Sequence, residues 1–381
     1  PNTITNLYTG LIFGAIGSSS TLNNVNLYNS NFDGGLFLSN NVTIANMYAG
    51  GFAGEIAGVV SLGNITSINY QVADIGILAN GAADNLSQDS FNSDDYDDYT
   101  VNMNGNAYVG GIAGRVETRF TFTGGSSSFT RINENGEAIR LSGSGDLYVG
   151  SIIGYVNSTV SNTNDLSLNI YNNIVSNANF VVVSGENPIN ARIGGMIGYI
   201  SGGDTVGDND SNSRVAIGSL NNATINYIGA AYLNAETINF GGIVGNVAFD
   251  SPNDIITLTN TVYGGALKVF GEKSNGGEVV FGGSIGYAGG TTNVTTGYNL
   301  NLLNNYNYGD AFVEYDTAVT PKLTALDSYT FGGLIGTMES SYRISANNNY
   351  SLVTSHNARY EEGIVYDENT SSSKVITNNA L

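Results

Sequence analysis

The chain of 381 residues is 41% hydrophobic but only 12% charged, about half the charged share of ~25% in an ordinary soluble domain. Its 32 acidic and 12 basic residues give a formal net charge of −20. This balance argues against a nucleic-acid partner, because phosphate binding needs clustered Lys and Arg. The chain contains no cysteine, which excludes disulfides and thiolate metal sites.

A short phrase of the form apolar-Gly-Gly-apolar-apolar-Gly-x-apolar recurs along the chain, most clearly as VGGIAGRV over Val109–Val116. Its last glycine falls at eight positions: Gly14, Gly54, Gly114, Gly154, Gly198, Gly245, Gly286 and Gly336. Successive copies are separated by 40, 60, 40, 44, 47, 41 and 50 residues. A period of this length is typical of solenoids and propellers, so we interpret these glycines as structural repeat positions.

The phrase itself is rich in β-branched and aromatic residues, which favours strand structure. Strict alternation places Val109 and Ala113 on one face of a strand, and Ile112 and Val116 on the other. This pattern predicts a strand buried on both faces. Alternatively, the Gly pair forms a bulge that shifts the alternation by one residue. The tyrosines that precede several copies are candidates to cover the glycines: Tyr8, Tyr48, Tyr108 and Tyr148.

The segments between the phrases contain further alternating, strand-like stretches, such as residues 166–170, 255–258 and 299–302. Clusters of Asn, Ser, Gly and Asp separate them and are typical of turns. Each repeat is therefore predicted to hold three or four short strands, and no stretch has a convincing 3.6-residue period.

These patterns predict an all-β fold, a parallel β-solenoid (β-helix) of about eight repeats. Residues 1–381 would form a single domain, with loop insertions near 80–105 and 201–214. A β-propeller is the alternative, because 40–50 residues per blade fits the period. However, the two-residue Asn-Gly and Asp-Gly turns that antiparallel blades favour are sparse.

The sequence offers few residues for catalysis. The only histidine is His356, and no nucleophile motif accompanies it. The acids that flank the phrase, Glu55 and Glu117, do not occupy matched positions as paired catalytic carboxylates would. We therefore expect no enzymatic activity.

One segment resembles the start of a calcium loop. Asp208, Asp210 and Asn212 place oxygen ligands on alternate residues. The glycine and the distant glutamate of a complete loop are missing, and a solvated polar turn is the alternative. Calcium is thus the one cofactor that the sequence suggests.

The recurring phrase resembles the GLUG repeat of bacterial surface proteins, whose core is Gly-Gly-Leu-Val-Gly or close to it. The nearest copies are FGGLIG over Phe331–Gly336 and FGGIVG over Phe240–Gly245. The resemblance implies an adhesin or haemagglutinin-like, secreted β-helical protein. It implies no catalytic residues.

Taken together, these features predict an extracellular or cell-surface structural protein, a rod that serves as subunit of a filament, sheath or adhesin. No stretch approaches the ~18 apolar residues of a membrane-spanning helix. Open sheet edges predict self-association end to end or through those edges. The alternative is a glycan-binding adhesin that uses loops 80–105 and 201–214, and a polysaccharide-degrading β-helix enzyme is a third possibility.

Overall fold

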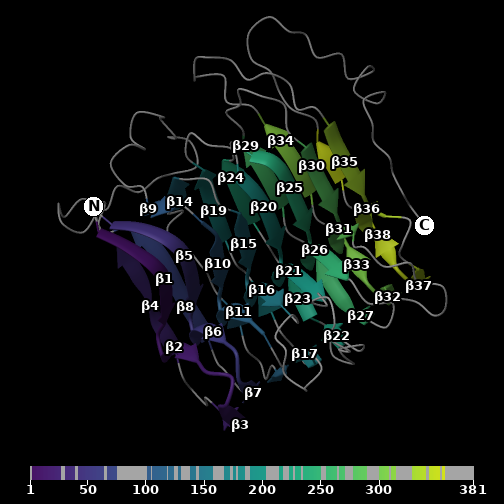
Figure 1. The fold of residues 1–381 in the computed structure, drawn as a ribbon. Helices are drawn as coiled ribbons and strands as arrows, with labels where there is room; N and C mark the ends of the chain where they lie inside the picture. Colours follow the sequence, from purple (N-terminus) through teal and green to yellow (C-terminus); the bar gives the residue numbers. More distant parts are fainter. Residues whose placement is uncertain are drawn as a thin grey trace, which may run out of the picture.

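The computed structural model is a parallel β-solenoid, with strands stacked coil upon coil from the N-terminal to the C-terminal end (Figure 1). Every pairing among its strands is parallel, so the solenoid prediction is confirmed and the antiparallel propeller is wrong. Within the described part of the chain there is no helix able to span a membrane. The structure describes residues 2–26, 31–38, 42–63, 67–74, 101–103, 105–117, 119–123, 128–129, 138–142, 146–157, 167–171, 175–176, 179–184, 189–202, 214–217, 223–225, 228–232, 235–249, 255–263, 266–270, 278–289, 300–308, 310–314, 328–339, 343–351 and 354–356.

Four sheets, here named A to D, form the walls. Sheet A has 15 strands in two ladders that meet at β5. Its first ladder contains β1 (Asn2–Gly10), β5 (Val42–Gly50), β10 (Ala107–Gly110), β15 (Leu147–Gly150), β20 (Ile189–Gly194), β25 (Ala235–Gly241), β30 (Glu278–Gly282) and β35 (Ser328–Gly332). Its second ladder contains β9 (Val101–Met103), β14 (Ala138–Ser142), β19 (Asn179–Ser184), β24 (Ile228–Tyr232), β29 (Ala266–Phe270), β34 (Asp310–Glu314) and β39 (Thr354–His356).

Sheets B, C and D have eight strands each. Sheet B contains β2 (Phe13–Ile16), β6 (Ala53–Ile56), β11 (Ala113–Val116), β16 (Ile153–Asn157), β21 (Ile197–Gly202), β26 (Val244–Phe249), β31 (Ile285–Gly289) and β36 (Ile335–Met338). Sheet C contains β3 (Thr21–Asn26), β7 (Val59–Gly63), β12 (Phe120–Thr123), β17 (Ser167–Tyr171), β22 (Arg214–Ile217), β27 (Ile255–Thr259), β32 (Leu300–Leu303) and β37 (Ile344–Asn347). Sheet D contains β4 (Asn31–Leu38), β8 (Ser67–Asp74), β13 (Ser128–Phe129), β18 (Val175–Ser176), β23 (Ala223–Ile225), β28 (Thr261–Tyr263), β33 (Tyr306–Asn307) and β38 (Tyr350–Ser351).

Each copy of the glycine phrase opens one coil, and the chain then visits sheets A, B, C and D before it returns to sheet A. Coil 1 holds β1 to β4, coil 2 holds β5 to β9, and each later coil adds five strands, so that coil 8 holds β35 to β39. The expectation of three or four strands per repeat was therefore too low. The eight coils match the eight copies of the phrase.

The glycine phrase is a corner between two sheets, not one continuous strand. In coil 3, β10 ends at Gly110 and β11 begins at Ala113. Val109, Ile112, Ala113 and Val116 are all fully buried in the same core. The prediction of one strand buried on both faces is thus wrong: the two-residue corner turns the chain, and both groups of apolar side chains face one interior.

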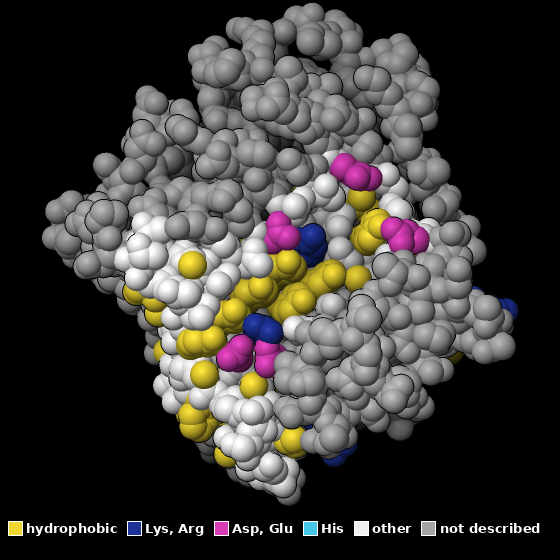
Figure 2. Space-filling view, in the orientation of Figure 1, with side chains coloured by type: hydrophobic (Ala, Val, Ile, Leu, Met, Phe, Trp, Pro, Cys, Tyr) yellow, Lys and Arg dark blue, Asp and Glu magenta, His cyan; other side chains and the backbone are white. Residues whose placement is uncertain are grey.

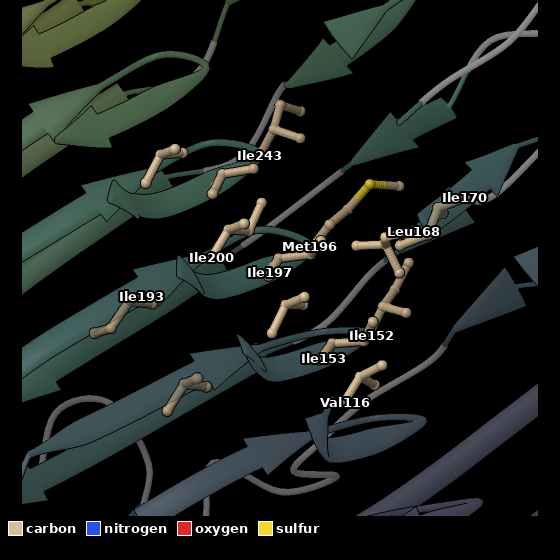
Figure 3. Close-up of a cluster of buried hydrophobic side chains, with 14 of the residues drawn as sticks. Val116, Ile152, Ile153, Leu168, Ile170, Ile193, Met196, Ile197, Ile200 and Ile243 are labelled. Carbon is tan, nitrogen blue, oxygen red and sulfur yellow. The ribbon is translucent and has the colours of Figure 1, made fainter. Parts of the chain in front are cut away.

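The core of the solenoid is built from apolar columns that repeat from coil to coil. Figure 3 shows the corner residues Ile152, Met196 and Ile243 in the same interior as Leu168 and Ile170 of β17, and all five are fully buried. Burial of each such side chain stabilises the fold by about 1.5–3 kcal/mol. Stacking of coils therefore produces one continuous hydrophobic core.

A second repeated corner joins sheets C and D and depends on asparagine. Asn260, Asn304 and Asn348 have φ values of 53°, 55° and 54°, a left-handed region that Asn tolerates better than most residues. The next position in each coil points inward, where Asn305 Oδ1 accepts hydrogen bonds from the backbone N and Oγ1 of Thr261 at 3.2 and 2.6 Å. A buried polar ladder thus fixes this corner.

Candidate functional site

An aromatic stripe runs along the outer face of the A–B corner. Four tyrosines of sheet A stand in register from coil 1 to coil 4, with ring centroids 4.7–4.9 Å apart and interplanar angles of 8–11°: Tyr8, Tyr48, Tyr108 and Tyr148. Tyr155 and Tyr199 of sheet B pack against this ladder, 5.0 and 5.6 Å from the Tyr148 ring. These six tyrosines define the aromatic stripe.

The stripe exists because the corner brings the outer faces of β-strands from two sheets together. The tyrosines lie two residues before the end of the sheet A strand, while Tyr155 and Tyr199 occupy the variable position of the phrase in sheet B. Stacked aromatic pairs contribute about 0.5–1.5 kcal/mol beyond the area that they bury. Figure 2 shows the stripe on the surface, with basic and acidic side chains on both of its sides.

An arginine cluster lies beside the stripe in coils 2 and 3. Arg115 forms ion pairs with Glu55, at 3.6 Å, and with Glu117. Its guanidinium lies 5.7 Å from the centroid of the Tyr48 ring, and its Nη1 donates a 3.4 Å hydrogen bond to the Tyr48 hydroxyl. Burial raises the pKa of Glu55, Glu117 raises it further, and Arg115 opposes both effects.

A second arginine cluster lies in coils 4 and 5. Arg192 Nη1 donates to Asp146 Oδ2 at 2.8 Å. The guanidinium lies 5.1 Å from the Tyr148 ring centroid and 5.5 Å from that of Tyr199. Tyr148 also donates to Asp146, at 3.2 Å. Burial is the main cause that raises the pKa of the Tyr148 hydroxyl well above its ordinary value.

The outer columns continue past the stripe with asparagines in coil 6. On sheet A, Arg192 is followed in register by Asn239. On sheet B, Tyr199 is followed by Asn246 and then by Tyr287, whose hydroxyl donates to Glu339. The sheet A column therefore changes from tyrosine in coils 1–4 to Arg192, Asn239 and Val280 in coils 5–7. The sheet B column is still aromatic in coil 5 and again in coil 7.

The ionisation of the stripe predicts a loss of stability in alkali. Burial is the main cause that raises the pKa of Tyr155 from 10.0 to about 12. In the unfolded chain this phenol ionises near pH 10, so the unfolded state loses the proton first. The contribution of the protonated Tyr155 phenol to folding stability is therefore complete below pH 10, falls as the pH rises, and is lost at about pH 12.

We expect chemical denaturation at a series of pH values to record this fall, with a shallower slope for Tyr155→Phe than for the wild type. Tyrosinate absorbance during the same titration identifies the ionising groups. Equal slopes for the two proteins would contradict the assignment to Tyr155.

The structure places the eight repeat glycines where two sheets approach closely. A Cβ on Gly54 would lie 2.5 Å from the Tyr48 carbonyl oxygen, and one on Gly114 would lie 2.6 Å from that of Tyr108. The backbone of the sheet A strands therefore covers these glycines, whereas the sequence predicted the tyrosines themselves as the cover. The contact involves the backbone of those strands, whereas the tyrosine rings extend further out to form the stripe.

Other predicted site residues remain untested. Asp208, Asp210 and Asn212 lie outside the described residues, as do most of the proposed binding loops 80–105 and 201–214. His356 ends β39, far along the chain from the stripe. Among the residues that the structure describes, no group of three or more His, Cys, Asp or Glu could hold a metal ion.

Sequence reasoning missed both arginine clusters. Glu55 and Glu117 were considered only as paired catalytic acids, and the structure instead places both against Arg115. The signal was available in the variable position of the phrase, which reads Glu55, Arg115, Tyr155, Tyr199, Asn246 and Tyr287 in successive coils.

Comparison of the chain with protein-family models, with curated proteins and with solved structures found no match in any of the three. The resemblance to GLUG repeats therefore stays a prediction. The solenoid presents two candidate functional features: a first coil with exposed apolar side chains, and an aromatic stripe with two arginine clusters.

Proposed function

We propose that this protein is an extracellular structural protein, a solenoid rod that associates with further copies of itself through its N-terminal coil. The observation that carries this proposal is the apolar surface of coil 1. Tyr8, Ile12 and Phe13 have exposed fractions of 36, 38 and 37%. The equivalent positions of coil 3 are fully buried or nearly so, because coils cover them on both sides.

The backbone of coil 1 also supports association. Within the part of the chain that the structure describes, its strands β1 to β4 pair with coil 2 along one edge only. An unpaired strand edge is a template for another strand, and association would satisfy its hydrogen-bonding groups while covering the exposed apolar side chains.

A second copy is the occupant that fits this edge, because every coil of the chain already pairs in parallel with the next. Among the described residues, β3 and β37 are the outermost strands of sheet C. Leu22 is half-buried on β3, and Ile344 and Ala346 are half-buried on β37. A contact between unlike ends is heterologous, and repetition of such a contact yields a filament. The rod would then act mechanically, without catalysis or a required cofactor.

The extracellular assignment has separate support. The repeated phrase of the chain resembles that of secreted surface proteins. Phe331–Gly336 and Phe240–Gly245 carry this resemblance. A surface built from Asn, Ser, Thr and Gly with few basic residues also offers few cleavage sites to trypsin-like proteases.

A charge on coil 1 tests the proposal. We expect wild-type protein at micromolar concentration to sediment as oligomers, visible as rods or filaments by electron microscopy. Phe13→Glu should weaken association at least tenfold, because it buries a charge at the contact. Leu303→Glu is the matched control, since Leu303 is 38% exposed on the side of the rod and should leave association unchanged.

Two results would overturn the proposal. One is a wild-type protein that stays monomeric across salt and calcium concentrations. The other is an equal effect of Phe13→Glu and Leu303→Glu, because a contact through coil 1 requires the two positions to differ.

A further inference from the structure

We propose that the outer face of the A–B corner, from Arg115 to Asn246, binds a linear, uncharged oligosaccharide. This site is separate from coil 1 and does not depend on the proposed self-association. On this face the fold buries several hydrogen-bonding atoms without partners. Buried polar groups in proteins are almost always paired, so each exception calls for an explanation.

Two of these atoms are acceptors. Asn239 and Asn246 are each only 6% exposed, and their Oδ1 atoms have no hydrogen-bond partner. They occupy the same outer columns as Arg192 and Tyr199, which contact each other across the corner. The two amides therefore lie on facing walls in coil 6, directly beyond the stripe.

Two further atoms are donors. The Nε atoms of Arg115 and Arg192 are buried and also lack a partner, although the Nη atoms of both residues are paired with carboxylates. Leaving a buried donor or acceptor unpaired costs about 1–3 kcal/mol. Four unpaired groups on one face are therefore a substantial cost, which a bound partner would remove.

A hydroxyl group satisfies both kinds of atom, because it donates one hydrogen bond and accepts others. An anion would pair with the arginine donors but would leave the asparagine oxygens unsatisfied. A cation would pair with the asparagine oxygens but would leave the arginine donors unsatisfied. The chemistry of the unpaired atoms thus favours a polyhydroxylated ligand over a charged one.

The charges on this face lead to the same conclusion. Five carboxylates line the outer columns and their margins, against two arginines that are already paired. They are Glu55, Glu117, Asp146, Glu278 and Glu339. Figure 2 shows acidic side chains on both sides of the apolar stripe, a distribution that repels polyanions.

The spacing of the unpaired atoms favours a chain over a single sugar. Arg115 belongs to coil 3, Arg192 to coil 5, and the two asparagines to coil 6. At ~4.8 Å per coil this separation is about 14 Å along the rod. Tyr148, Tyr155 and Tyr199 lie between these positions, and tyrosine is well suited to contacts that combine apolar and polar groups.

Isothermal titration with defined hexasaccharides tests the proposal. The neutral probes are linear hexasaccharides of glucose, mannose, galactose, xylose and N-acetylglucosamine, and the charged probes are those of galacturonic acid and glucosamine. We expect saturable binding of at least one neutral probe and no binding of the charged probes. Absence of binding by every neutral probe, or binding confined to the charged ones, would overturn the proposal.

Two variants locate the site. Asn246→Ala removes one unpaired acceptor, and Arg192→Lys keeps the positive charge but removes the Nε donor. Each should weaken binding of the neutral probe about tenfold, with the far-UV circular dichroism of the fold retained. Asn301→Ala, in sheet C, is the matched control and should bind as the wild type does.

Unchanged affinity in both variants would place the binding elsewhere on the chain and overturn the assignment. An unchanged or lower stability of Asn246→Ala without any sugar binding would indicate that ordered water already serves these atoms. That result would also overturn the proposal.

Discussion

Gly114→Ala is expected to lower the free energy of unfolding by about 3 kcal/mol, the upper part of the range for overpacked sites. A Cβ at this position would lie 2.5 Å from the Ala49 backbone nitrogen, 2.6 Å from the Tyr108 carbonyl oxygen and 2.8 Å from the Gly54 carbonyl oxygen. All three atoms belong to the backbone of strands in coils 2 and 3, so none can move as a flexible side chain would. The methyl group must therefore separate sheet A from sheet B.

Gly17→Ala provides the matched control, because a Cβ on Gly17 would meet no atom within 4 Å. This substitution should change stability by less than about 1 kcal/mol, and it is expected to be slightly stabilising because alanine restricts the unfolded chain. Urea denaturation followed by far-UV circular dichroism measures both variants. Equal stability of the two would show that the A–B corner does not require close backbone approach.

The same steric requirement explains why the fold could be predicted from sequence. A glycine that faces two backbones admits no other side chain, so the requirement recurs once per coil and gives the period of Gly14 to Gly336. The apolar residues beside each glycine, such as Val109 and Val116, then form columns because successive coils are equivalent. Periodicity of this kind survives even where coil lengths differ.

The path of the chain within a coil was harder to predict. Alternation assigns Val109 and Ile112 to opposite faces only if the strand stays straight. The chain instead turns at Gly111 and Ile112, so both residues reach one core. The spacing of residues in the sequence does not reveal such a turn, because a corner and a bulge both consist of glycine flanked by apolar residues.

The candidate site was predictable only in its sheet A half. Tyr8, Tyr48 and Tyr108 stand at the same distance before their glycines, and their ladder follows from the register. The contacts of Arg192 with Tyr199 depend on the angle between two sheets, which no single strand determines. The proposed calcium ligands at Asp208 and Asp210 lie outside the described residues and stay a prediction.

The second large effect is expected at the asparagine corner, where Asn305→Ala should destabilise the protein by about 2–4 kcal/mol. Asn305 is only 1% exposed. Its side chain accepts a hydrogen bond from Thr261 and donates through Nδ2 to the Leu258 carbonyl oxygen at 3.1 Å. It also donates to Asn349 Oδ1 at 2.9 Å. Alanine would leave the Thr261 donors and the Leu258 acceptor buried without this partner.

Two further substitutions separate the hydrogen-bond network from the general cost of removing an amide. Asn301→Ala, on the half-buried outer side of β32, should change stability by no more than about 0.5 kcal/mol. Asn305→Thr introduces the residue that stands at the matching position of the preceding coil, Thr261. It should cause an intermediate loss of stability because its hydroxyl replaces part of the network.

Hydrogen exchange at Thr261 provides a local readout, and the Thr261 amide should exchange faster in Asn305→Ala than in Asn305→Thr. Equal exchange in the two variants would show that the Thr261 amide does not depend on Asn305, and that the left-handed asparagines alone hold this corner.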